Sequence, residues 1–327
     1  QAKTQGVSEE KLNVLETQLT PTAQINEPKL AVQNKSESLS QKRKKSSEQK
    51  KKEKKATKLN LKGSNPSQQQ LSSLLEHYQN GRFNDAEKLA VSITQEFPKH
   101  PFGWKVLGAV LGATGRKSEA VNANQTAVAL SPQDAAAHSN LGNTLKELGR
   151  LDEALASYTQ AIALEPDFAE VHYNLGVTLQ GLSRLDEAEA SYTQAIALKP
   201  GLAEAHSNLG NTLQELGRLD EAEASCTQAI ALKPDFAEAH YNLGVTLQEL
   251  DRLDEAEANY SKALSLKPDF ADALYNRSLL LFEKAKYEAA LRDADACVSK
   301  KARVHTLTLL YALGRIDEIY KRLEIQS

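Results

Sequence analysis

Apolar and small residues recur with helical spacing through most of the chain, and residues 135–168 show the pattern most clearly. A first stripe has i, i+3, i+4 and i+7 spacing and consists of His138, Leu141, Gly142 and Leu145. A second stripe has i, i+4 and i+7 spacing and consists of Ala154, Tyr158 and Ala161. Because each segment is apolar on one side only, the pattern predicts two amphipathic helices that pack against each other.

The pattern repeats at a constant interval, which equals the distance from Pro98 to Pro132. Prolines, which cannot continue a helix, mark the period at Pro98, Pro132, Pro166, Pro200, Pro234 and Pro268. Seven units can be counted, and they start near Ser67, Pro101, Ala135, Ala169, Ala203, Ala237 and Ala271. A period of this length with two helical segments predicts an all-α stack of helix pairs. Acidic residues flank the joints, the short segments between successive units. We expect capping boxes there from Asp167 with Glu170 and from Asp235 with Glu238.

Both ends of the chain depart from the period. Residues 1–65 contain no aromatic residue and few aliphatic ones, which predicts a disordered tail. Residues 314–318 repeat the inter-helix turn earlier than strict spacing requires. Residues 305–327 are therefore expected to form a degenerate helix pair or a C-terminal cap after an array that spans residues 66–304.

In their details the units resemble the tetratricopeptide repeat (TPR) family. Residues 135–168 read AAAHSNLGNTLKELGRLDEALASYTQAIALEPDF, and residues 203–236 read AEAHSNLGNTLQELGRLDEAEASCTQAIALKPDF. The resemblance implies a right-handed α-solenoid of about seven repeats, with the first helix of each unit on a concave face. It also implies a protein-interaction scaffold, of a type found in bacterial proteins, that binds extended peptide segments on that face.

An asparagine stands at the sixth position of five successive units, at Asn140, Asn174, Asn208, Asn242 and Asn276. The resemblance places this position on the concave face. An asparagine amide can both donate to and accept from a peptide backbone, whatever the peptide's sequence. The row is similar to the asparagine ladder in the superhelical TPR domain of O-linked N-acetylglucosamine transferases, and we expect it to bind peptide. The first two units carry Ser72 and Val106 at this position and are not expected to take part.

Two neighbouring positions alternate from unit to unit. The fifth position reads Ser139, Tyr173, Ser207 and Tyr241, and the ninth reads Asn143, Val177, Asn211 and Val245. We expect Tyr173, Tyr241, Asn143 and Asn211 to belong to the peptide-binding site, which would then repeat in pairs of units. The alternative is that the asparagines cap helices, bond locally or reflect recent duplication of one unit.

The net charge of −3 combines two unlike parts. Residues 1–65 carry 15 basic and 7 acidic side chains, and more than half of the positions in segment 41–58 are Lys or Arg. Residues 135–270 carry 9 basic and 22 acidic side chains. The repeats are therefore expected to repel nucleic acid and to favour neutral or basic peptides. The tail is either a solvated linker or a contact for an anionic partner.

The sequence contains no recognisable catalytic or metal-binding constellation, and we expect a non-catalytic protein without cofactors. Four histidines recur one unit apart, at His138, His172, His206 and His240, which is too far for them to share a metal ion. Trp104 at the equivalent position indicates a packing slot. Cys226 and Cys297 stand where other units carry Tyr or Ala, which predicts buried fillers rather than reactive thiols.

Two further hypotheses stay open. The chain begins at Gln1 and contains no Met, as expected of a piece of a longer product. The array would then recruit substrates to a glycosyltransferase, sulfotransferase, methyltransferase or 2-oxoglutarate/iron oxygenase domain outside this chain. The other hypothesis is nucleic-acid or anionic-surface binding through the basic tail. Two cysteines and the lack of a bilayer-length apolar run favour a cytoplasmic protein.

Overall fold

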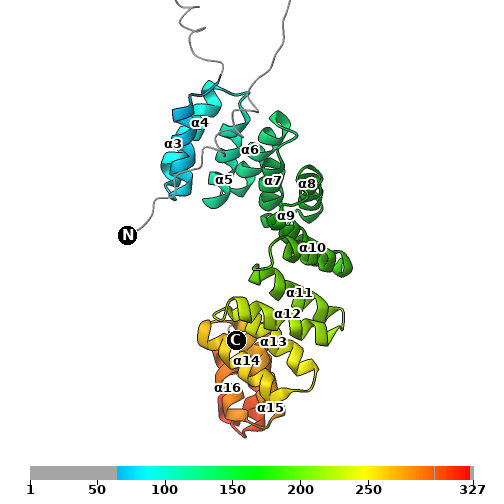
Figure 1. The fold of residues 1–327 in the computed structure, drawn as a ribbon. Coiled ribbons are helices and arrows are strands. Elements are labelled where there is room, and N and C mark those ends of the chain that lie inside the picture. Colours follow the sequence, from blue (N-terminus) through cyan, green and yellow to red (C-terminus); the bar gives the residue numbers. More distant parts are fainter. Residues whose placement is uncertain (1–64, 298, 325–327) are drawn as a thin grey trace, which may run out of the picture. The chain divides into compact units, whose positions relative to one another are not determined.

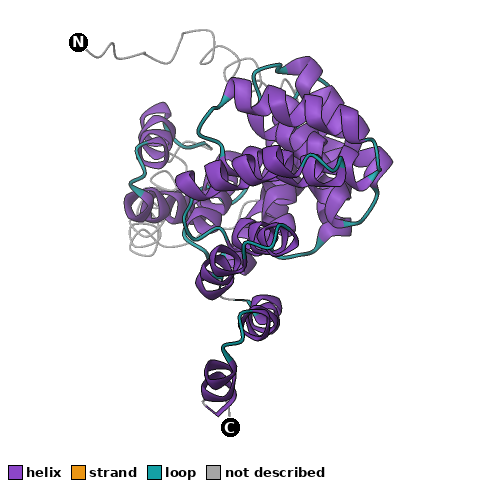
Figure 2. Cartoon of the chain, turned by 90° about the horizontal axis from the view of Figure 1, so that it is seen from below, coloured by secondary structure: helices purple, strands orange, loops and turns teal. Residues whose placement is uncertain are grey.

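The structure is a computed structural model that describes residues 65–297 and 299–324. This part of the chain consists of helices joined by short turns, without a strand (Figure 1 and Figure 2). In chain order the helices are α3 (Gln68–Gln79), α4 (Phe83–Glu96), α5 (Pro101–Ala113), α6 (Lys117–Leu130), α7 (Ala135–Glu147), α8 (Leu151–Leu164), α9 (Ala169–Gly181), α10 (Leu185–Leu198), α11 (Ala203–Glu215), α12 (Leu219–Leu232), α13 (Ala237–Glu249), α14 (Leu253–Leu266), α15 (Ala271–Glu283), α16 (Tyr287–Ala296), α17 (Lys300–Ala312) and α18 (Ile316–Glu324). Except for Asn65, the predicted basic tail lies outside the described residues.

The helices form consecutive pairs. In each pair an odd-numbered helix, the first helix of a unit, packs against the even-numbered second helix that follows it. Each second helix also packs on the first helix of the next unit, so the pairs stack in sequence order (Figure 1). From α3 to α13 successive first helices contact one another as well, whereas no two second helices in the described part do so to a similar extent. This confirms the predicted α-solenoid, in which the first helices of neighbouring units lie closer together than their second helices do.

Within a unit, a glycine at the eighth position faces a buried aromatic ring. The pairs are Gly142 with Tyr158, Gly176 with Tyr192 and Gly244 with Tyr260, and all three tyrosines are fully buried. A Cβ atom added to Gly142 would lie 2.6 Å from the Tyr158 ring, which is closer than real contacts allow. In the fifth unit Gly210 faces Cys226 instead. The missing side chain lets the two helices approach with only the ring between them.

The capping boxes expected at the joints are not formed. The N-cap residues of α9 and α13 are Phe168 and Phe236, and neither makes a side-chain cap hydrogen bond. Asp167 and Asp235 stand one residue too early, because a capping side chain must occupy the N-cap position to reach the N–H groups of the first turn. Side-chain caps occur instead at the starts of α3, α7 and α17, from Ser67, Asp134 and Ser299.

From the second to the sixth unit, the fourth position, where the sequence predicts a packing slot, makes a contact across the joint instead; the seventh unit has Leu274 there. The imidazole Nε2 of four histidines lies 2.8–3.2 Å from the backbone oxygen of the proline that precedes it, in His138, His172, His206 and His240. The indole N–H of Trp104 donates to the Pro98 oxygen at 2.9 Å in the same way. Because an indole nitrogen can only donate, this slot supplies a donor to the carbonyl group that ends the preceding unit.

The last helix pair follows a shortened seventh unit. The second helix α16 has 10 residues, whereas its counterpart α14 has 14. The first helix α17 therefore begins at Lys300, whereas the period from Ala237 to Ala271 would place its start at His305, and this accounts for the early turn at residues 314–318. The boundary that we predicted between residues 304 and 305 lies inside α17. In this register His305 takes the place in α17 that Asn276 takes in α15.

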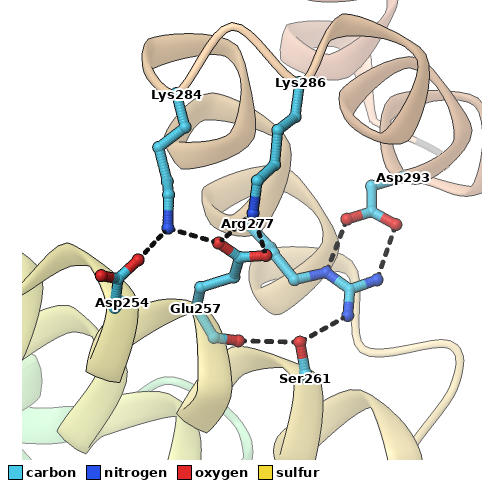
Figure 3. Close-up of polar contacts among 7 residues, drawn as sticks. All are labelled: Asp254, Glu257, Ser261, Arg277, Lys284, Lys286 and Asp293. Atoms are coloured by element: carbon cyan, nitrogen blue, oxygen red, sulfur yellow. Dashed lines mark hydrogen bonds and ion pairs between the residues drawn. The ribbon is translucent and has the colours of Figure 1, made fainter.

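The seventh unit also contains an arginine in the apolar stripe. Arg277 occupies the position of Leu141 in the third unit, and its guanidinium donates to both carboxylate oxygens of Asp293 at 2.6 and 2.7 Å (Figure 3). It also donates to the Ser261 hydroxyl at 2.9 Å. The side chains of Arg277 and Asp293 are 22% and 10% exposed. This largely buried pair links α14, α15 and α16.

Further ion pairs surround it at the surface. Lys284 pairs with Asp254 and Glu257 of α14, and Lys286 pairs with Glu257 at 3.0 Å (Figure 3). Asp254 and Lys286 are exposed, and ion pairs with such partners each contribute little to stability, about 0–1 kcal/mol. Lys284 and Glu257 are 18% and 25% exposed, so their pair is better shielded. The loss of one partner from a buried pair matters far more, because the other charge is left without compensation.

Replacing Gly142 by alanine is expected to destabilise the array by about 1–3 kcal/mol, because the new methyl group overlaps the buried ring of Tyr158. Gly112→Ala is the matched control, since nothing lies within 4 Å of a Cβ atom added at this position of α5. The control should leave the stability unchanged or raise it by up to about 1 kcal/mol. Urea unfolding followed by far-ultraviolet circular dichroism measures both variants, and equal midpoints would contradict the packing role of Gly142.

Arg277→Leu alone leaves the Asp293 carboxylate buried without its partner and is expected to cost about 3 kcal/mol. The second substitution Asp293→Ser, which installs the residue found at Ser157 and Ser191 in earlier units, removes that carboxylate. The double variant should therefore regain most of the lost stability. Unfolding midpoints of the two single variants and the double variant test this. A double variant as unstable as Arg277→Leu would mean that the loss does not come from the stranded charge.

Candidate functional site

Positions 2, 5, 6, 9, 12 and 13 of a unit lie on one side of its first helix, because they are spaced by three, four or seven residues. On α7, α9, α11, α13 and α15 we call this side the first-helix face. The predicted site residues all lie on it, at Asn140, Asn143, Tyr173, Asn174, Asn208, Asn211, Tyr241, Asn242 and Asn276. Because successive first helices from α7 to α13 contact one another, the face runs on from unit to unit.

Three asparagines of the row bond to the first helix of the preceding unit. The Nδ2 atoms of Asn208 and Asn276 donate to the hydroxyls of Tyr173 and Tyr241, at 3.3 and 3.1 Å. The Nδ2 atom of Asn242 donates to the hydroxyl and the backbone oxygen of Ser207, at 3.1 and 3.3 Å. All four bonds use the amide nitrogen. The amide oxygens of these asparagines have no hydrogen-bond partner among the described residues.

The other two asparagines of the row behave differently. Lys146 on α7 donates to the amide oxygen of Asn174 at 2.7 Å, and Asn174 is only 7% exposed. Burial lowers the pKa of this lysine, against the opposing effect of nearby Glu147 and Glu170. The side chain of Asn140 makes no hydrogen bond within the described part of the chain. Open acceptors held by an inter-unit bond therefore occur in units five to seven.

Tyrosines at the fifth position alternate with serines, as the sequence indicates. The rings of Tyr173 and Tyr241 each lie 6.0 Å, centre to centre, from the buried tyrosine of their own unit. Burial raises the pKa of both phenols. In the units between, the serines Ser139 and Ser207 are buried. The face thus carries a half-buried ring in every second unit.

Asn143 and Asn211, which we predicted to be equivalent, have different partners. The amide oxygen of Asn143 accepts a hydrogen bond from the hydroxyl of the buried Tyr158 at 2.7 Å. The fifth unit has Cys226 in place of that tyrosine, and the Asn211 amide donates to Glu215 at 2.7 Å. Asn143 therefore satisfies a buried phenol, whereas Asn211 orients an exposed carboxylate.

Acidic side chains at the second position are partly paired. Glu204 lies 3.3 Å from the Lys233 ammonium, and Glu238 lies 3.0 Å from that of Lys267. These lysines are the C-cap residues of α12 and α14. These pairs are not among the contacts predicted from the sequence, although acid and lysine have the same separation along the chain in both. Glu170 and Asp272 are exposed and make no ion pair within residues 65–297 and 299–324.

The described residues contain no group of three or more His, Cys, Asp or Glu side chains that could hold a metal ion. Cys226 and Cys297 are free thiols, and both are buried, as predicted for fillers. Burial raises the pKa of Cys226 to about 12. None of the described helices has the length and apolar character needed to cross a membrane.

Comparison with family models gives matches to tetratricopeptide repeats over residues 123–156, 142–183, 182–217, 203–236 and 237–270. A comparison with curated proteins gives no match. The similarity of the asparagine row to that of O-linked N-acetylglucosamine transferases therefore stays a prediction.

Several solved structures have a similar fold. The APC/C hetero-tetramer Cut9-Hcn1 matches with 18% identity and a TM-score of 0.63, over 72% of this chain and 48% of that one. A tetratricopeptide repeat protein from Parabacteroides merdae ATCC 43184 matches with 18% identity and a TM-score of 0.58, over 74% and 98% of the two chains. PilW, a type IV pilus biogenesis factor, matches with 23% identity and a TM-score of 0.57, over 62% and 96%. At these identities the likeness shows the fold alone.

Cys226 and Cys297 are expected to resist iodoacetamide in the folded protein at mildly alkaline pH. Both thiols are buried, and the raised pKa of Cys226 keeps it in the unreactive protonated form. Both should react readily once the protein is unfolded in urea. Mass spectrometry of the alkylated protein measures the rates, and equal rates in the folded and unfolded states would contradict the filler role.

Proposed function

Because the chain is a tetratricopeptide repeat protein and hence a protein-interaction scaffold, we propose that its first-helix face binds extended peptide segments of partner proteins. The residues that carry the binding are Asn208, Asn242 and Asn276. Asn140, Asn174 and Tyr173 extend the same face toward its N-terminal end, and Tyr241 lies between Asn208 and Asn276.

The observation that carries the proposal is the arrangement of the three amides. Each uses its nitrogen to bond the preceding unit, while its oxygen has no partner among the described residues. A carbonyl oxygen of this kind accepts a hydrogen bond from a peptide N–H, which every residue except proline offers. Three such acceptors, one per unit, suit an extended chain and place little demand on its sequence.

The bonds within the protein also lower the cost of binding. A free asparagine side chain loses rotamer freedom when a ligand immobilises it, at about 0.5–1.5 kcal/mol for each flexible side chain. Here the bond to Tyr173, Ser207 or Tyr241 already fixes the amide plane. The acceptors are therefore preorganised, and a larger part of each new hydrogen bond contributes to affinity.

Charge limits the kind of segment that fits. Residues 135–270 carry 22 acidic and 9 basic side chains, and Glu170 and Asp272 at the second position have no ion-pair partner in the described part. Such a surface favours neutral or basic peptides and repels polyanions such as nucleic acid.

The test uses the full chain and a phage-displayed library of random unstructured peptides. Peptides selected on the wild-type protein are synthesised, and their affinities are measured by fluorescence anisotropy. The triple variant Asn208→Ala, Asn242→Ala and Asn276→Ala should bind them about 100-fold more weakly, since three hydrogen bonds of about 1 kcal/mol each are lost.

The matched control is the triple variant Gln160→Ala, Gln194→Ala and Gln228→Ala, which removes three amides from exposed positions on the second helices. It should bind the peptides with unchanged affinity. Circular dichroism at the assay temperature verifies that both variants are folded. Selection of no peptide at all, or equal affinity of the asparagine variant and the wild-type protein, would refute the proposal.

A further inference from the structure

Two places on the first-helix face bring together the same three groups. Each consists of a fifth-position tyrosine and, from the next unit, the sixth-position asparagine and the second-position acid. The Tyr241 corner comprises Tyr241, Asn276 and Asp272, and the Tyr173 corner comprises Tyr173, Asn208 and Glu204. In both corners the asparagine bonds the phenol, at 3.1 and 3.3 Å. The acid and the asparagine of each corner are four residues apart on one helix and lie side by side on the same face, so the carboxylate lies on the side of the helix that meets the phenol. In agreement with this, the carboxylate is, after burial, the second cause that raises the pKa of each tyrosine.

Elsewhere in the chain, a second-position acid and an aromatic ring together bind a lysine side chain. The Lys267 ammonium lies 3.0 Å from the Glu238 carboxylate and 4.7 Å from the centre of the Phe270 ring. Lys233 is placed in the same way, 3.3 Å from Glu204 and 4.8 Å from the Phe236 ring. In each case a cation is held by a carboxylate on one side and an aromatic face on the other.

In the described part of the chain, the Tyr241 corner has no lysine of the kind that pairs with Glu204 and Glu238 in the two preceding units. Lys233 and Lys267 are C-cap residues of 14-residue second helices, whereas the shorter α16 has Cys297 as its C-cap residue. Asp272 therefore has no lysine of its own unit beside it. It is exposed and makes no ion pair among the described residues, while the Tyr241 ring beside it also lies 4.9 Å from Phe270.

From these contacts we infer that the two corners are seats for basic side chains, lysine or arginine, of the peptide bound on the first-helix face. The cation lies against the tyrosine ring and pairs with the carboxylate, and the asparagine fixes the ring. The inference rests on the proposed function and adds the chemistry of the partner to it.

The two seats differ in strength. Asp272 is free to pair with the ligand, whereas Glu204 already shares its charge with Lys233. The Tyr241 corner should therefore contribute more to affinity than the Tyr173 corner. The corners are two units apart, roughly 20 Å if neighbouring first helices are about 10 Å apart. An extended peptide covers that span in about six residues, so its two basic side chains should recur at about this spacing.

The experiment uses the peptides selected from the phage-displayed library on the full chain. They should be enriched in Lys or Arg at two positions about six residues apart. Tyr241→Ser and Asp272→Ala should each lower their affinity about fivefold, and Tyr173→Ser and Glu204→Ala should have smaller effects. These substitutions are compatible with the fold, since Ser207 and Ala136 occupy the same positions in other units. Replacing the basic residues of the peptide by alanine should abolish the effect of Asp272→Ala and Glu204→Ala, which leave the asparagine–tyrosine bonds intact.

Other outcomes separate this inference from the proposed function. Selected peptides that depend on the three asparagines but carry no basic residues, or that bind the Tyr241→Ser and Asp272→Ala variants as tightly as the wild-type protein, would overturn the inference alone. Enrichment of apolar or aromatic residues at the two positions would also overturn it. Selected peptides whose affinity is the same for the triple asparagine variant and the wild-type protein would refute the proposed function and this inference together.

Discussion

The close approach of a glycine to a buried aromatic ring determines how the two helices pack in the third, fourth and sixth units. Gly142 leaves space for Tyr158, and the same arrangement recurs at Gly176 and Gly244. The ring is fully buried, yet its hydroxyl is satisfied at the edge of the unit by Asn143, or by a glutamine in the fourth and sixth units. A larger residue at the glycine position would push the helices apart, and every later unit would be displaced with them.

Because each unit has nearly the same geometry, successive first helices meet at equivalent positions. The asparagine row lies at this contact, and the amides of Asn208, Asn242 and Asn276 have two roles at once. The nitrogen joins neighbouring units, and the oxygen stays available on the first-helix face. The bonds that set the step between units therefore also hold the proposed binding groups in place, so the face is organised before any partner arrives.

The units are similar in sequence without being equivalent in the structure. In the fifth unit Cys226 stands in place of the tyrosine, so Asn211 has no phenol to bond and donates to Glu215 instead. In the fourth unit the amide oxygen of Asn174 accepts a hydrogen bond from Lys146. In the seventh unit the Arg277–Asp293 pair replaces an apolar contact, and the short helix α16 shifts α17 to a new register. The same shortening leaves Asp272 without the lysine that earlier units place next to this position. Differences of this kind give each part of the face its own chemistry.

The sequence by itself determined the helices, their pairing and the order of the units, because these follow from local periodicity, proline positions and glycine spacing. It also indicated which positions share the first-helix face, since that depends only on the turn of one helix. The capping boxes were predicted wrongly because the helices begin one residue later than the pattern suggests.

Only the tertiary structure decided which asparagine oxygens are open, which acids are paired and where the last pair begins. Asn143 and Asn211 look alike in sequence, but their partners depend on residue 158 or 226, which lies on another helix. The pair between Glu204 and Lys233 likewise joins groups at opposite ends of one unit. Such contacts depend on the distances between packed helices, and a period read along one chain contains no information on those distances.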